Sequence, residues 1–319
     1  MGYDGGVSAN PRPPYAPVRT PGKSGNSGRY RGSSRRSRRR VWPVILMALG
    51  GFLLLAVGLA LTITAVGVHF FGQRVEVPQA AAPPLGPRID LSDFQAGNLI
   101  SDAVFYDYNS MDLSAIETFI REKNAGCQGE TTVCLADYQE DTVDIPPSPR
   151  CRGYQGAPGE SAAAIIYQTA QACRINPQVL LVLIQKEQGL LTASGSDLTP
   201  SRYDIAAGFG CPDGANCDPQ YFGFGTQVYY AAAQFQRYRQ NPAQFQFRAG
   251  QMNSIPFAPN SSCGAASVYL ENQATAALYN YTPYQPDSGV LAGTPGQCSS
   301  YGNANFFGIF KAWFGNPRK

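Results

Sequence analysis

Residues 41–71 carry no Asp, Glu, Lys or Arg, and His69 is their one titratable side chain. The segment is almost wholly apolar between Val44 and Val66, which exceeds the ~20 residues that a helix needs to cross a bilayer. A secretory signal peptide has a shorter apolar region, about 7–15 residues, and usually a small-x-small cleavage site. We therefore expect one transmembrane helix at 41–71 that acts as an uncleaved signal anchor, with cleavage as the minor alternative.

The segment before this span is strongly basic. Residues 1–40 are rich in Gly, Ser, Pro and Arg and hold ten Lys or Arg against one acid, a net charge of +9. Because the formal net charge of the whole chain is +3, the remaining residues carry −6. Five arginines between Arg35 and Arg40 directly precede the span, and such residues stay on the cytoplasmic side. The sequence predicts a disordered cytoplasmic tail at 1–40 that contacts anionic lipid headgroups and no nucleic acid. We expect a single-pass plasma-membrane protein whose C-terminal part faces the cell wall.

Beyond the span, residues 72–98 contain four prolines among small residues and predict a linker, and folding signals begin near Leu99. All eight cysteines lie in 99–319, which indicates disulfides in an oxidising compartment. Eight cysteines allow about 105 pairings, so the connectivity stays open. The chain has no C-x-x-C and a single histidine, so we expect no metal, no cofactor and no His-dependent catalysis. Proximity favours Cys127–Cys134, Cys211–Cys217 and Cys263–Cys298, which leaves Cys151–Cys173.

Residues 99–319 predict a mainly α fold with minor β structure, stabilised by these disulfides. Residues 245–268 are rich in Pro, Gly and Asn with alternating pieces, and they predict a small β hairpin. Asn176-Pro177 is a strong helix start, and Gly189 is placed to end that helix. Apolar spacing predicts helices at 112–123, 160–173, 177–188, 226–239, 267–278 and 305–314.

Glu187 is the candidate catalytic residue, because it lies at the end of the apolar run that starts at Val179. Leu180, Ile184 and Glu187 share one helix face. Apolar surroundings and the negative helix end both favour the protonated carboxyl group that a general acid needs. Lys186 is expected to point elsewhere. The competing interpretation is a structural Glu that binds an arginine or a backbone cap.

Two later segments give this helix a context, namely 222–227, a glycine-rich turn with Gln227, and 277–283, with Tyr279, Asn280 and Tyr281. In order and spacing, residues 160–285 resemble the motif series of lysozyme-like lytic transglycosylases. The resemblance implies that Glu187 is the catalytic acid, that Gln227 supports the substrate cleft, and that Tyr279 and Asn280 line it. Tyr279 and Tyr281 are expected to stack on sugar rings. The family's usual Ser after the Glu is Gln188 here. The exported part also looks like bacterial membrane-anchored proteins of unassigned function, some loosely labelled hemagglutinin-like.

The number of carboxylates would separate hydrolysis from transglycosylation. Most glycosidases use two acids, and Asp197 and Asp204 are the candidates for the second, although each fits a turn or capping role better. The resemblance implies a single carboxylate with attack by the sugar's own 6-hydroxyl. We expect cleavage of peptidoglycan glycan strands, with a non-catalytic glycan-binding or adhesin module as the alternative. A scaffold for cell-wall assembly, docked through the basic tail, is a third possibility, and the oligomeric state stays open.

Overall fold

The computed structural model describes residues 89–319, so the expected tail, transmembrane helix and most of the linker lie outside the described residues. The described part is mainly helical with minor strands. No helix within it is both long and apolar enough to cross a membrane. The α-helices are α2 (Asp102–Phe105), α3 (Leu113–Lys123), α4 (Ala162–Cys173), α5 (Pro177–Gln188), α6 (Pro200–Asp204), α7 (Phe224–Gln240), α8 (Gln273–Tyr281), α9 (Ser288–Ala292) and α10 (Gly302–Phe314).

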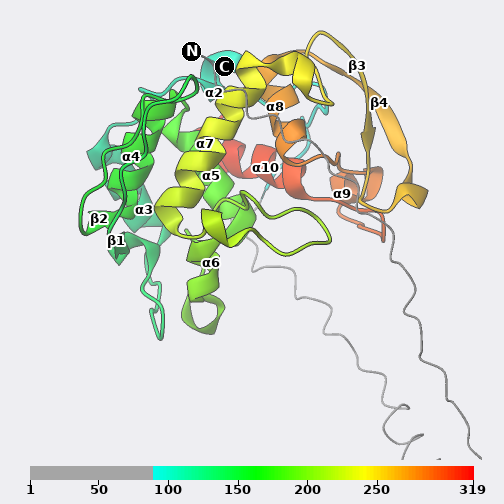
Figure 1. The fold of residues 1–319 in the computed structure, drawn as a ribbon. Coiled ribbons are helices and arrows are strands. Elements are labelled where there is room, and N and C mark those ends of the chain that lie inside the picture. Colours follow the sequence, from blue (N-terminus) through cyan, green and yellow to red (C-terminus); the bar gives the residue numbers. More distant parts are fainter. Residues whose placement is uncertain (1–88) are drawn as a thin grey trace, which may run out of the picture. The chain divides into compact units, whose positions relative to one another are not determined.

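Helix α5 lies at the centre of the core and packs against α4, α7 and α10 (Figure 1). It begins as predicted, because the side chain of Asn176 accepts a hydrogen bond from the Gln178 N–H and Pro177 fills the first helical position. It ends at Gly189, whose φ of +66° is a left-handed conformation that glycine adopts without strain. Its residues 179–184 are almost fully buried, so this helix anchors whatever its last turn carries.

Two antiparallel strand pairs flank the helices. Strand β1 (Gln139–Glu140) pairs with β2 (Glu160–Ser161), and β3 (Gln251–Pro256) pairs with β4 (Ala265–Leu270), on opposite sides of the molecule in Figure 1. The second pair confirms the predicted hairpin. The predicted helix at 267–278 is wrong in its first part, because β4 continues to Leu270 and α8 begins only at Gln273. Asn272 caps α8 by accepting from the Thr275 N–H.

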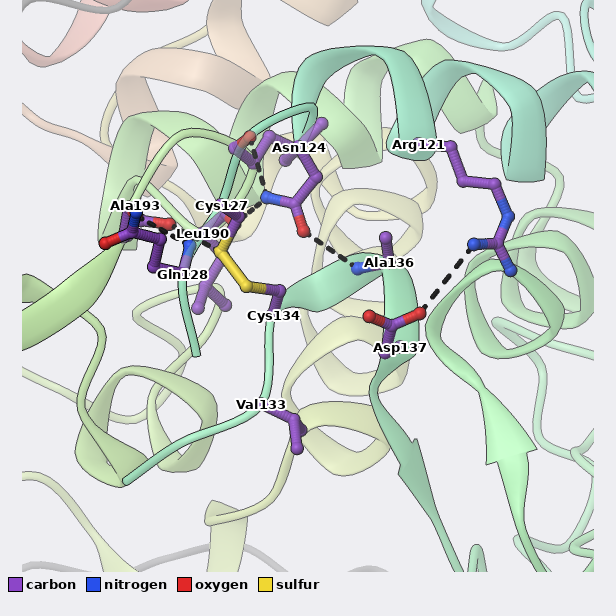
Figure 2. The surroundings of a disulfide bond; sticks show 12 residues. Arg121, Asn124, Cys127, Gln128, Val133, Cys134, Ala136, Asp137, Leu190 and Ala193 are labelled. Carbon is purple, nitrogen blue, oxygen red and sulfur yellow. Dashed lines mark hydrogen bonds and ion pairs between the residues drawn. A yellow bond between two sulfur atoms is a disulfide. The ribbon is translucent and has the colours of Figure 1, made fainter. Parts of the chain in front are cut away.

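The four disulfides follow the predicted pairing, namely Cys127–Cys134, Cys151–Cys173, Cys211–Cys217 and Cys263–Cys298. Figure 2 shows the first of them beside Asn124, the residue that ends α3. The Asn124 amide donates to the Leu191 carbonyl (3.0 Å) and accepts from the Ala136 N–H (2.9 Å). The disulfide and this buried amide therefore fix the chain that leaves the C-terminal end of α5.

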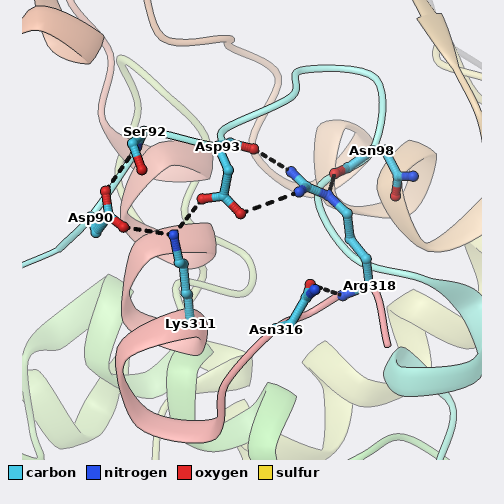
Figure 3. Close-up of polar contacts among 7 residues, drawn as sticks. All are labelled: Asp90, Ser92, Asp93, Asn98, Lys311, Asn316 and Arg318. Atoms are coloured by element: carbon cyan, nitrogen blue, oxygen red, sulfur yellow. Dashed lines mark hydrogen bonds and ion pairs between the residues drawn. The ribbon is translucent and has the colours of Figure 1, made fainter.

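The last ten residues of the expected linker, 89–98, lie along α10, so the folded part begins before Leu99. Lys311 of α10 pairs with Asp90 (2.7 Å) and with Asp93, and Arg318 donates to the Asn98 carbonyl (2.8 Å; Figure 3). The hydrogen bonds from Lys311 hold the pKa values of both carboxyl groups below their ordinary range. These contacts attach the start of the described chain to its last helix.

Replacing Lys311 by Met should lower the stability of the protein at pH 6–7. Carboxyl groups whose pKa is depressed by folding stabilise the folded state above their unfolded pKa of about 4, and this contribution is lost as the pH falls through the folded value. The difference in thermal midpoint between wild type and Lys311→Met should therefore shrink as the pH is lowered from about 4 to 2. A difference that stays constant over this range would contradict the role given to Asp90 and Asp93.

Candidate functional site

Glu187 lies in the last turn of α5 with 23% of its side chain exposed. Its carboxylate lies against the backbone of Gly208, where an added Cβ would be only 3.0 Å from the Oε2 atom of Glu187. Gly208 has a φ of +69°, which also favours glycine. Both the turn and the close approach of the backbone to the carboxylate therefore favour glycine at this position.

The prediction that Lys186 points away from Glu187 is wrong. Its Nζ donates to Oε1 of Glu187 and to the Thr282 hydroxyl (2.9 Å), and only 5% of its side chain is exposed. Adjacent positions on a helix point about 100° apart, but the long lysine side chain is flexible enough to turn back over the helix end. The contact places a positively charged group beside the Glu187 carboxylate.

Gln227 is fully buried on α7, and its amide holds the loop formed by Ala207, Gly208 and Phe209, here called the 207–209 loop. Its Oε1 accepts from the N–H groups of Ala207 (3.3 Å) and Phe209 (3.0 Å). Its Nε2 donates to the carbonyls of Phe209 (2.9 Å) and Tyr221 (2.7 Å). Gln227 therefore positions the loop that touches Glu187, and its amide is occupied by backbone groups.

Tyr281 reaches the same loop from α8. Its hydroxyl donates to the Ala207 carbonyl (2.7 Å), and its ring stacks on Phe235 with 4.8 Å between centroids. Burial raises the pKa of Tyr281 well above its ordinary value, and the nearby charge of Glu187 adds to this rise. Glu187, Gln227 and Tyr281 thus meet at the 207–209 loop.

The other two predicted residues of α8 lie elsewhere. Asn280 donates to the Phe247 carbonyl (2.8 Å) and accepts from the Phe247 N–H (3.0 Å). Tyr279 is fully buried beside the Phe247 ring, and its hydroxyl has no hydrogen-bond partner among the residues of the described chain. Because residues two apart on a helix point about 200° apart, Tyr279 and Tyr281 face different directions. The contacts of Tyr279 and Asn280 position the chain at residue 247.

No second carboxylate is hydrogen-bonded to Glu187 within residues 89–319. Asp197 lies in a short 3₁₀ turn, and Asp204 ends α6. A carboxylate outside the predicted site, Glu140, accepts from the Gly225 N–H (2.6 Å) at the start of α7. A carboxylate at this end of a helix satisfies a free N–H and the positive helix dipole, so Glu140 supports the helix that carries Gln227.

Gly208, Lys186 and Thr282 were also absent from the predicted site. The sequence around these residues does not indicate a role in the site, because each of them reaches it through a contact that forms only in the folded protein. Comparison of the whole chain with protein-family models, with curated proteins and with solved structures found no match.

Proposed function

We propose that residues 99–319 form a lysozyme-like domain that cleaves the β-1,4 glycosidic bonds of peptidoglycan glycan strands, as a lytic transglycosylase or muramidase. The domain would lie outside the plasma membrane, anchored by the span at 41–71, with the basic tail against anionic lipid headgroups. The observation that carries the proposal is the meeting of Glu187, Gln227 and Tyr281 at the 207–209 loop. Three segments that are far apart in the sequence supply these residues, in the order of the motif series they resemble.

Glu187 would act as a general acid and then as a general base. It would protonate the leaving glycosidic oxygen, and its carboxylate would then accept a proton from the attacking hydroxyl group. A single carboxylate suffices when the sugar's own 6-hydroxyl attacks. Because Lys186 donates to Glu187, the first step requires that the carboxyl group exchange this contact for a proton.

A turbidity assay on purified cell walls tests the proposal. Wild type should clear the suspension, and Glu187→Gln should do so at least 100-fold more slowly, since general acid–base catalysis contributes about 10²–10⁴-fold. Glu117→Gln makes the same change at an exposed position of α3 and should keep the wild-type rate. Equal clearing by wild type and Glu187→Gln, or no clearing by either, would contradict the enzymatic proposal.

The second candidate function is a glycan-binding module without catalysis. The contact between Lys186 and Glu187 favours it, because the lysine occupies one of the two carboxylate oxygens that a catalytic acid would turn toward its substrate. Binding to insoluble peptidoglycan without release of reducing ends or anhydro-sugars would decide for this function. Release of either product that depends on Glu187 would decide against it.

A further inference from the structure

Four arginines line a cavity of about 570 Å³ between the C-terminal ends of α4 and α7 and the chain at 148–152. Its lining shares no residue with the site around Glu187. We call it the arginine cavity, and its charged residues are Arg150, Arg152, Arg174 and Arg239. We propose that the arginine cavity binds an anion with at least two phosphate groups.

The walls of the arginine cavity are tied together by covalent and hydrogen bonds. The Cys151–Cys173 disulfide joins its two sides, and the Arg152 N–H donates to the Ala172 carbonyl (2.9 Å). The buried amide of Gln236 donates to the carbonyls of Cys173 (2.7 Å) and Arg174 (3.2 Å). The backbone around the cavity is therefore held in place before any ligand binds.

The charge of the cavity stands out against the rest of the described chain. Residues 89–319 contain thirteen Lys or Arg against twenty Asp or Glu, a formal charge of −7. Four of these thirteen basic residues line the arginine cavity, and no acidic residue does. None of the four forms an ion pair with another residue of the described part. Their charges are therefore available to an external anion.

Two of the guanidinium groups are already restrained. Arg152 donates to the Gln171 carbonyl (2.7 Å), and Arg239 lies over the Tyr106 ring, 4.0 Å from its centroid. Arg174, a lining residue that ends α4, is the one non-glycine residue with a positive φ (+52°) in the described chain. Restraint in the unbound state lowers the entropy that a ligand must remove on binding.

The guanidinium group selects the class of ligand. Its planar set of N–H donors matches two oxygens of a phosphate or carboxylate, with strong, charge-assisted hydrogen bonds. Four such groups carry more positive charge than one carboxylate or one orthophosphate can balance. A free oligophosphate and a phosphodiester polymer present the same oxygens to the cavity, so the experiment includes both.

Titration calorimetry on the full chain in detergent tests the proposal, with pyrophosphate and a glycerol-phosphate oligomer as the two ligands. The buffer contains about 150 mM salt, which screens long-range electrostatic attraction. At least one ligand should bind saturably. Arg150→Gln combined with Arg174→Gln should raise its Kd about tenfold or more, through loss of charge-assisted bonds. The matched control, Arg121→Gln combined with Lys319→Gln, removes the same charge outside the cavity and should change Kd less than about twofold.

A third variant separates guanidinium recognition from charge alone. Arg150→Lys combined with Arg174→Lys keeps the charge and should still raise Kd several-fold, because lysine does not donate in the planar, two-pronged geometry. Tighter binding of one ligand identifies the source of the phosphates. Absence of saturable binding to either ligand, an equal loss in the Gln pair and the control pair, or wild-type affinity in the Lys pair would overturn the proposal.

Discussion

Replacing Gln227 by Leu should lower the free energy of unfolding by about 3 kcal/mol or more. Leu has a similar volume but makes no hydrogen bonds. The N–H groups of Ala207 and Phe209 and the carbonyls of Phe209 and Tyr221 would lose their partner. Each unsatisfied buried polar group costs about 1–3 kcal/mol, and opening of the loop to water would recover part of the sum. Urea unfolding of wild type and variant measures the difference.

Gln236→Leu is the matched control for this prediction, since it makes the same change at a buried position on the same helix. The Gln236 amide donates to two backbone carbonyls, so its loss should cost less than the loss of Gln227. Only Gln227→Leu should also impair glycan cleavage by the molecules that remain folded, because only Gln227 holds the loop beside Glu187. Equal stability losses, or full cleavage by folded Gln227→Leu, would contradict the role assigned to this amide.

The sequence was sufficient for elements whose signals are local. Asn176, Pro177 and Gly189 mark both ends of α5, and the predicted and observed helices have the same bounds. The disulfide pairing could be predicted for a similar reason. All four pairs join cysteines that follow one another in the sequence; proximity favoured three of them, and the fourth, Cys151–Cys173, followed from what remained. In each case the deciding contacts lie within a few tens of residues.

The first part of the predicted helix at 267–278 fails because partners distant in the sequence decide its conformation. The Ala-rich run at 274–277 is helical, but Val268 and Tyr269 have the β-favouring side chains of a strand. Strand β4 pairs with β3, and the Glu271 N–H donates to the Gly97 carbonyl (2.9 Å) on its other side. The helical spacing of residues in this segment carries no information about these two contacts, because their partners lie elsewhere in the sequence.

The candidate site was predictable only in part. Glu187 stands out because it is a polar residue on an apolar helix face. Gln227 stands out because it follows a glycine-rich turn. The face of α8 that meets them was not determined, because Tyr279 and Tyr281 differ by only two positions and their directions depend on how the helix packs. Lys186 was excluded by helix geometry alone, although its long side chain reaches Glu187.

Replacing Gly208 by Ala should slow glycan cleavage by about 10-fold, and by no more than the roughly 100-fold cost of moving a catalytic group by about 1 Å. The new Cβ would lie 3.0 Å from Oε2 and 3.2 Å from Cδ of Glu187, so the carboxylate has to move. The φ of +69° adds about 1–2 kcal/mol of backbone strain. Turbidity clearing, corrected for the folded fraction, measures the effect.

Gly250→Ala separates displacement of the carboxylate from backbone strain. Gly250 has nearly the same φ, +74°, but a Cβ there would meet nothing within 4 Å, so this variant carries the strain without touching Glu187. It should lose a similar amount of stability and clear cell walls at close to the wild-type rate. If the two glycine variants clear equally well, the position of the Glu187 carboxylate does not control the reaction. The meeting of Glu187, Gln227 and Tyr281 would then serve binding or stability rather than bond cleavage.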